Sequence, residues 1–144
     1  MFNKILLATD DSVPAKKAID YVQNIAIKYN AEVILLNTYY IPDMFNGKPS
    51  EHYMYLSKVE ENMKEHGEKI LYETSEKMKA KNINVNTLLI KGPTGPTIVS
   101  EAEKNNCDLI VMGSRGLGNV TSILISSASN YTIHHAKCPV LLIK

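Results

Sequence analysis

Five short apolar runs alternate with longer amphipathic stretches, and this alternation constrains the fold more than any other feature of the chain. The runs are rich in isoleucine, valine and leucine and show little polar alternation, which is typical of strands covered on both faces. The stretches between them repeat apolar residues at intervals of three and four, which indicates helices. The runs comprise residues 4–9, 32–38, 84–90, 109–113 and 140–143.

This order of strands and helices predicts an α/β fold: an open, five-stranded parallel sheet with helices on both faces. Ser12 and Pro14 are placed to begin the first helix, Ser12 as its cap and Pro14 within its first turn. Asn30 and Asn82 stand where two helices are expected to end. Pro139 marks the start of the last strand, where a missing N–H is tolerated.

Residues 39–56 interrupt the pattern. They hold proline, glycine and asparagine residues together with Tyr40, Tyr53 and Tyr55. Loops of this length in compact domains usually act as functional lids or are disordered. We therefore expect a mobile cover near the strand ends, and the alternative is a solvent-exposed connector.

Composition restricts the classes of function. A chain of 144 residues forms one domain, residues 1–144, with a core of its own. Its 16 basic and 15 acidic residues leave a net charge of +1, which gives no support to nucleic-acid binding. No apolar run approaches the roughly 18–20 residues that span a bilayer, and the first residues lead directly into a strand rather than a signal peptide. We expect a cytoplasmic protein without nucleic-acid or membrane partners.

The cysteines and histidines are not spaced as a metal site. Cys107 and Cys138 each begin an apolar run, and a single pair in a chain of this size indicates reduced, half-buried thiols. A zinc site needs closely spaced ligand pairs, which are missing from the sequence. His134 and His135 project in different directions from a helix, so both are expected at the surface. No metal is expected to be held by side chains alone.

Small and acidic residues follow two of the predicted strands. The first ends in Ala8-Thr9-Asp10-Asp11-Ser12 and the fourth in Met112-Gly113-Ser114-Arg115-Gly116. Ligands of open parallel sheets bind at the carboxyl ends of strands, where the strand order reverses. If these two strands are central neighbours, Asp10 directs a carboxylate into their shared crevice. The two glycines then let the backbone approach phosphate oxygens without a Cβ in the way.

A further helix begins at Ser126-Ser127, after nine intervening residues, and its free N–H groups suit an anion. Taken singly, each signal has a plainer explanation, because glycines often mark turns and Asp-Asp-Ser often caps a helix. The spacing is neither a Walker A motif nor a dinucleotide fingerprint. Together the signals predict an anion or nucleotide site, with Arg115 either adding positive charge or facing solvent.

The chain resembles the universal stress protein family, specifically its small single-domain members, over essentially all 144 residues. KILLATDDS at 4–12 looks like the family's first strand and acidic turn, and AEVILLN at 31–37 resembles its second strand. CDLIVMGSRG at 107–116 is close to a family signature, and CPVLLI at 138–143 resembles the usual ending. With right-handed crossovers, the resemblance implies a Rossmann-like sheet of the adenine nucleotide alpha hydrolase type, in strand order 3-2-1-4-5.

The ATP-binding branch of that family carries Gly-x-x-Gly, nine residues and then Gly-Ser or Gly-Thr. This chain has Gly113, Gly116 and Ser127 at the matching positions. It departs from the pattern at Ser126, which replaces a glycine, and at Asp11, where glycine is common in the first turn. A side chain at Ser126 would crowd a phosphate if the backbone there needs a positive φ, although its hydroxyl can also donate to a phosphate oxygen.

The resemblance implies that Asp10 contacts ribose, that Thr9 and Thr38 lie along the adenine, and that residues 113–116 and 126–129 hold ribose and phosphates. The implied ligand is ATP or another adenine nucleotide, with Mg²⁺ or Mn²⁺ as the cation that would relieve the added charge of Asp11. The candidate nucleotide-binding residues are Ala8, Thr9, Asp10, Asp11, Ser12, Thr38, Met112, Gly113, Ser114, Arg115, Gly116, Ser126, Ser127, Ala128 and Ser129.

Three functions remain open at this point. The first is a stress-response regulatory module that binds a nucleotide, and the second is a slow ATPase, although no base for activating water is evident. The third is a dimeric interaction protein without nucleotide affinity. A homodimer is expected because the last strand would form an apolar sheet edge, as the resemblance also implies, unless Lys137 and Lys144 shield it. The residues of that edge are Val140, Leu141, Leu142 and Ile143.

Overall fold

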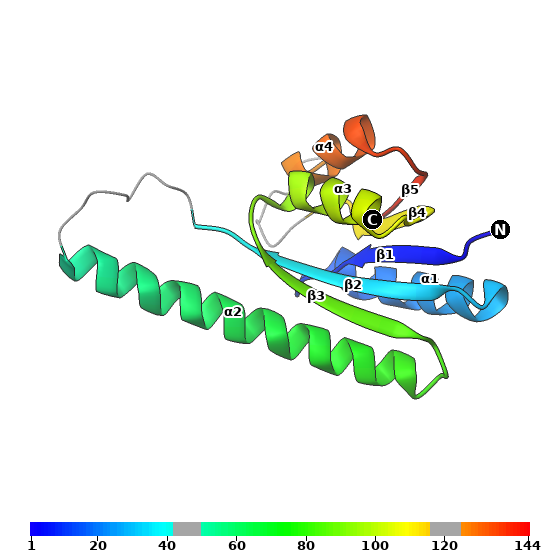
Figure 1. Ribbon diagram of the computed structural model, residues 1–144, viewed down its shortest axis with the longest axis horizontal. Helices are drawn as coiled ribbons and strands as arrows, with labels where there is room; N and C mark the ends of the chain where they lie inside the picture. The colour runs from blue at the N-terminus through cyan, green and yellow to red at the C-terminus, as the bar shows by residue number, and fades with distance from the viewer. Residues whose placement is uncertain (42–49, 116–124) are drawn as a thin grey trace.

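The computed structural model describes residues 1–41, 50–115 and 125–144, with the backbone alone for residues 50–52. Within these ranges five strands pair in parallel in the order β3-β2-β1-β4-β5, which confirms the predicted fold (Figure 1). The strands are β1 Lys4–Ala8, β2 Glu32–Tyr39, β3 Val85–Lys91, β4 Leu109–Gly113 and β5 Val140–Ile143. The helices are α1 Val13–Tyr29, α2 Ser50–Lys79, α3 Thr94–Lys104 and α4 Ser127–His135.

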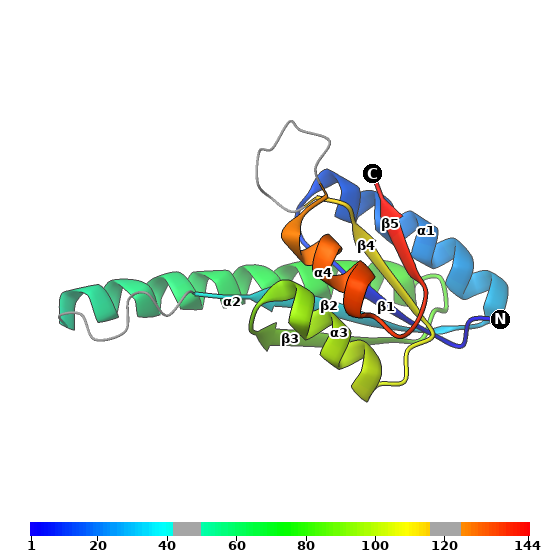
Figure 2. The ribbon, with the colours of Figure 1, turned by 90° about the horizontal axis from the view of Figure 1, so that it is seen from above.

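Helices α1 and α2 cover one face of the sheet, and α3 and α4 cover the other (Figures 1 and 2). Successive residues of a strand point to opposite faces. In β1, Ile5 and Leu7 therefore pack with the α1 and α2 side chains, whereas Leu6 packs in the same cluster as Ile98 of α3. All four side chains are 0% exposed. This burial on both faces explains why the strands show so little polar alternation in the sequence.

The helix ends follow the predicted capping residues. Ser12 caps α1 in an extended conformation, and its Oγ accepts a hydrogen bond from the backbone N–H of Ala15 at 3.3 Å. Asn30 ends the same helix with a φ of 53°, and Asn82 adopts a φ of 59° after α2. Asparagine adopts this left-handed conformation more readily than most residues, so the sequence signals at both helix ends are confirmed.

Helix α2 begins earlier than the sequence suggested. Its 30 residues span about 45 Å, and its amino-terminal half extends beyond the sheet (Figures 1 and 2). The prediction of a loop was wrong for residues 50–56, which are helical, while residues 42–49 lie outside the described part of the chain. Tyr53 and Tyr55 are 75% and 69% exposed, so this part of the helix lacks the buried apolar stripe by which a helix is predicted from sequence. Among the described helices, none has the length and apolar character needed to cross a bilayer.

A single glycine sets how closely α2 approaches the sheet. A Cβ atom on Gly67 would lie 2.5 Å from Oδ1 of Asn37 in β2 and 2.7 Å from Cδ1 of Leu89 in β3. Both distances are below van der Waals contact, so a larger residue would have to displace the ends of these two side chains. Gly67 therefore allows α2 to lie close to the two strands, with the Asn37 side chain beneath the helix.

Candidate functional site

Strands β1 and β4 are hydrogen-bonded neighbours at the centre of the sheet, with Leu7 beside Val111. Their carboxyl ends meet at a pocket of about 310 Å³, near the lower end of the range for small-molecule sites. Most of the predicted site residues line this pocket: Ala8, Thr9, Asp10, Ser12, Thr38, Met112, Gly113, Arg115, Ser126, Ser127 and Ala128. Sequence reasoning did not identify the other lining residues, which are Ala15, Leu36, Asn37, Thr94 and Ile98.

The two neighbouring aspartates make different contacts. Asp10 lines the pocket, and its Oδ1 accepts a hydrogen bond from the backbone N–H of Ser12 at 2.8 Å. Asp11 is not among the lining residues, and its Oδ2 lies 2.5 Å from Nε2 of His66 on α2. The acidic turn therefore gives the pocket one carboxylate and gives the other to α2.

The second wall of the pocket is formed by the end of β4 and the start of α4. The hydroxyl of Ser129 donates to the carbonyl of Gly113 at 3.1 Å, and the N–H of Ser126 donates to the carbonyl of Ser114 at 3.0 Å. Ser114 and Ser129 are buried behind the wall rather than at its surface. Gly116 lies outside the described residues, so its predicted role stays a prediction.

Gly113 was expected to let phosphate oxygens approach the backbone, but the structure gives a different reason for a glycine at this position. A Cβ atom there would lie 3.0 Å from both the backbone nitrogen of Ala15 and the Cβ of Pro14. The glycine thus lets the first turn of α1 pack against the end of β4. A close approach of phosphate is not needed to explain why this residue is glycine.

The concern about Ser126 is also removed by the structure. Ser126 is the N-cap of α4, with φ −60° and ψ 155°, so a positive φ is not required there. Its Oγ accepts a hydrogen bond from the N–H of Ser129 at 3.1 Å, which is the standard role of a serine cap. The next residues, Ser127 and Ala128, begin the helix and line the pocket, where the first N–H groups have no helical partner. Arg115 lies on the same wall.

A third group of residues comes from the ends of β2 and β3. The hydroxyl oxygens of Thr38 and Thr94 lie 2.9 Å apart, and both residues line the pocket. Thr94 begins α3 directly after Gly92-Pro93, a turn signal at the carboxyl end of β3 that could have drawn attention to it. Thr38 was expected from the family resemblance, whereas Thr94 was not predicted, because the sequence pattern placed the site at the ends of the first and fourth strands.

Thr9 marks the part of the pocket whose polar groups are incomplete. Its side chain is 5% exposed, and among the described buried side-chain atoms its hydroxyl oxygen has no hydrogen-bond partner. Its backbone, by contrast, is fixed, because the Thr9 carbonyl accepts from Nδ2 of Asn37 at 2.8 Å. A buried hydroxyl without a hydrogen-bond partner lowers the stability of the folded state. The Thr9 hydroxyl is therefore free to bond to a ligand group in the pocket.

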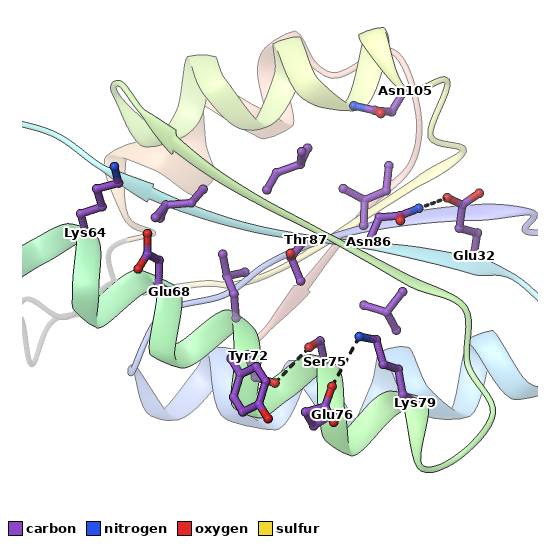
Figure 3. A pocket seen from close by; sticks show the side chains of 15 residues that line it. Glu32, Lys64, Glu68, Tyr72, Ser75, Glu76, Lys79, Asn86, Thr87 and Asn105 are labelled. Carbon is purple, nitrogen blue, oxygen red and sulfur yellow. Dashed lines mark hydrogen bonds and ion pairs between the residues drawn. The ribbon is translucent and has the colours of Figure 1, made fainter.

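A larger hollow of about 900 Å³ lies along β3 and α2, away from the strand ends (Figure 3). It holds none of the predicted site residues, and several of its polar groups pair with one another. Nδ2 of Asn86 donates to Oε1 of Glu32 at 2.5 Å, and Nζ of Lys79 lies 3.4 Å from Oε1 of Glu76. Ligands of open parallel sheets bind at the carboxyl ends of the strands, and this groove lies elsewhere, so it is not the candidate site.

The described lining residues of the smaller pocket are poor ligands for a free cation. Asp10 is the carboxylate among them, and no group of three or more histidine, cysteine, aspartate or glutamate side chains comes together in the described parts of the chain. Magnesium takes several oxygen ligands and is usually bound through one or two carboxylates together with substrate phosphates. A divalent cation would therefore need phosphate oxygens from a bound ligand.

The model of the universal stress protein family matches residues 1–144. The universal stress protein MJ0531 of Methanocaldococcus jannaschii is 33% identical over the whole chain and 83% of its own length. YxiE of Bacillus subtilis is 27% identical over the full length of both proteins. Among solved structures, the protein MJ0577 of Methanocaldococcus jannaschii superposes with a TM-score of 0.89 at 26% identity, covering 100% of this chain and 96% of that one.

Two further solved structures contain adenine nucleotides. A universal stress protein in complex with cAMP has a TM-score of 0.68 at 22% identity, covering 99% of this chain and 96% of that one. A universal stress protein family protein from Arabidopsis thaliana with AMP bound has a TM-score of 0.68 at 21% identity, covering 99% and 91%. At these identities the likeness shows a shared fold.

Proposed function

Because the chain belongs to the universal stress protein family, we propose that it is a stress-response regulatory module. In this proposal the pocket between the ends of β1 and β4 binds ATP or another adenine nucleotide. One observation carries the proposal. A carboxylate, the amino end of a helix and a pair of hydroxyls, contributed from the ends of four different strands, meet around a single cavity. These are the groups that a ribose, a phosphate and a base edge require.

Each wall suits one part of a nucleotide. The carboxylate of Asp10 can accept hydrogen bonds from ribose hydroxyls. The free N–H groups at the start of α4 and the positive charge of Arg115 favour phosphate. The hydroxyls of Thr38 and Thr94 can each donate and accept, as the edge of a base requires.

The dimensions of the pocket favour the nucleoside and its first phosphate inside the cavity. Its volume of about 310 Å³ is small for a whole triphosphate. Arg115 and Ser127 are exposed, so the phosphate end of the pocket opens to solvent. Further phosphates would extend through this opening, where a Mg²⁺ or Mn²⁺ ion could join them. The cAMP and AMP complexes of family members with the same fold support an adenine nucleotide as the ligand class.

Binding rather than hydrolysis is the function that the described lining residues favour. Hydrolysis needs a base or a metal that activates water. Asp10 and Arg115 are the charged side chains among the described lining residues, and one oxygen of Asp10 already accepts from Ser12. We therefore propose a ligand-controlled module in preference to an ATPase.

Self-association through β5 is the second part of the proposal. The N–H of Ile110 donates to the carbonyl of Pro139, and the N–H of Ser114 donates to that of Ile143. Odd-numbered residues of β5 therefore face β4, and the backbone groups of Val140 and Leu142 point to the free edge of the sheet. Both side chains are only half-buried. An apolar edge with free backbone groups is suited to pair with a second copy of the chain.

Two neighbouring carboxylates provide a matched test of the nucleotide site. Isothermal titration calorimetry measures the affinity of ATP, ADP, AMP and cAMP for the wild type, Asp10→Asn and Asp11→Asn. Each variant removes one negative charge from the same turn, so long-range electrostatic effects are equal. We expect Asp10→Asn to weaken binding at least tenfold, about 1.4 kcal/mol, and Asp11→Asn to change it less than about threefold. Equal losses in the two variants, or no nucleotide binding by the wild type, would overturn the proposal.

A further inference from the structure

The two cysteines lie together at the other end of the sheet, away from the nucleotide pocket. Cys107 stands between α3 and β4, and Cys138 stands directly before β5. The α3–β4 and α4–β5 connections run side by side in both views (Figures 1 and 2). Both cysteines line one cavity of about 350 Å³, and both pack against the apolar cluster beneath α3 and α4. Each is free and half-buried.

The register of the sheet brings the two chain segments to the spacing of neighbouring strands. Ile110 pairs with Val140, and the N–H of Ile110 donates to the carbonyl of Pro139 at 3.0 Å. Cys107 and Cys138 precede this pair by three and two residues. Neighbouring strands lie about 4.8 Å apart, and the Cα atoms of a disulfide lie about 4.4–6.8 Å apart. The spacing of neighbouring strands therefore falls within the range that a disulfide spans, and the two cysteines line one shared cavity.

The electrostatics of the pair agree with this placement. Burial raises the pKa of the Cys107 thiol to about 11, and the negative charge of Cys138 is the second cause of the rise. Burial also raises the pKa of Cys138, while a backbone hydrogen bond acts in the opposite direction. The effect of the Cys138 charge on Cys107 agrees with two thiols that lie close together.

We propose that Cys107 and Cys138 form a reversible intramolecular disulfide when the protein meets a hydroperoxide. The thiolate of Cys138 attacks a peroxide oxygen, the O–O bond breaks, and a sulfenic acid and one water or alcohol result. The sulfur of Cys107 then attacks the sulfenic sulfur, the S–O bond breaks, and water leaves with the Cys107 proton. Two thiols are oxidised by two electrons and one hydroperoxide is reduced. A thiol returns the pair to the reduced state by exchange.

The position of the cross-link gives it a structural consequence. It would close the chain between residues 107 and 138, the segment that supplies the end of β4 and the start of α4 to the nucleotide pocket. A disulfide across this segment restricts the unfolded chain and raises the unfolding temperature. The chemistry is independent of whether the pocket binds a nucleotide, so either proposal can fail alone.

Intact mass spectrometry after treatment with hydrogen peroxide tests the disulfide. We expect the wild type to lose the mass of two hydrogen atoms and both free thiols together. A peptide joining residues 107 and 138 should appear after digestion, and a reductant should reverse all three changes. The rate should rise about tenfold per pH unit near neutrality, because the thiolate is the reacting species. The cross-linked protein should unfold at a higher temperature than the reduced protein.

Cys107→Ser and Cys138→Ser are the matched controls, and neither should lose two hydrogen atoms. Three results would overturn the proposal. The first is a gain of oxygen at Cys138 while the Cys107 thiol persists. The second is a cross-linked dimer in place of the internal bond. The third is that both thiols stay free in the folded wild type, although the same peroxide treatment forms the disulfide in the urea-unfolded chain. In that case the two cysteines would act only as small, buried apolar side chains.

Discussion

A Cβ atom on Gly113 would lie 3.0 Å from the Cβ of Pro14, so the end of β4 and the first turn of α1 meet without room for a side chain. A larger residue at position 113 must push the two elements apart. We expect Gly113→Val to destabilise the fold by about 1–3 kcal/mol and Gly113→Ala by less, because overpacking grows with volume. Urea unfolding of the two variants measures the difference. Equal stability of the valine and alanine variants would contradict the steric explanation.

Ser126 should act on stability rather than on the fit of a phosphate. Because its Oγ caps α4, Ser126→Ala should cost about 1 kcal/mol, and Ser126→Gly only a few tenths. Thermal unfolding monitored by circular dichroism compares the two variants with the wild type. Since φ is −60° at this residue, Ser126→Gly should leave nucleotide affinity within about twofold of the wild type. A markedly tighter complex in the glycine variant would show that the serine does obstruct the site.

The free edge of β5 allows a test that separates backbone from side chain. Leu142→Pro removes an N–H that points away from β4, whereas Leu142→Ala removes most of the side chain and keeps that N–H. If two copies pair through this edge, the proline variant should be monomeric and the alanine variant should still dimerise. Analytical ultracentrifugation measures the mass, and circular dichroism confirms that both variants are folded. A dimeric proline variant, or a monomeric wild type, would exclude this interface.

The thiol of Cys107 should make stability fall at alkaline pH. Its pKa rises from 9.0 to about 11 on folding, because burial disfavours the thiolate. The contribution of this thiol to the free energy of unfolding is therefore fully present below about pH 9. It is lost between about pH 9 and 11, where the unfolded chain holds fewer protons than the folded one. Since the group is half-exposed, we expect a loss of about 1 kcal/mol. Urea unfolding of the reduced wild type and Cys107→Ser across this range isolates the effect from other titrating groups, and parallel curves would contradict it.

The order of the sheet could be predicted because its signals are local or follow from a general rule. Continuous apolar runs identify strands buried on both faces, and right-handed crossovers limit the order in which they pair. The caps at Ser12 and Asn30 are equally local, because one residue supplies the conformation or the hydrogen bond. The start of α2 was missed because Tyr53 and Tyr55 are exposed on a part of the helix that no sheet residue covers.

The candidate site was predictable in position and less so in detail. The strand-end rule located Asp10 and Ser127 on one pocket. The direction of Asp11 toward His66 depends on where α2 crosses the sheet, and a contact between residues so distant in the chain leaves no pattern in the sequence. The same holds for Thr38 and Thr94, whose hydroxyls meet only once β2 and β3 are paired. The reason for a glycine at position 113 could not be predicted either, because it depends on where α1 packs against β4.

The hydrogen bonds that join the two ends of the β4–α4 connection have a consequence for how the fold tolerates changes in the length of that connection. The carbonyls of Gly113 and Ser114 accept hydrogen bonds from Ser129 and Ser126, so the end of β4 and the start of α4 are joined directly rather than only through the intervening chain. The entropic free-energy cost of closing a loop rises only with the logarithm of its length, so each doubling of the length costs about 0.6 kcal/mol. Lengthening the connection between residues 117 and 124 by a few residues should therefore lower the free energy of unfolding only slightly, while the distance between the end of β4 and the start of α4 remains the same.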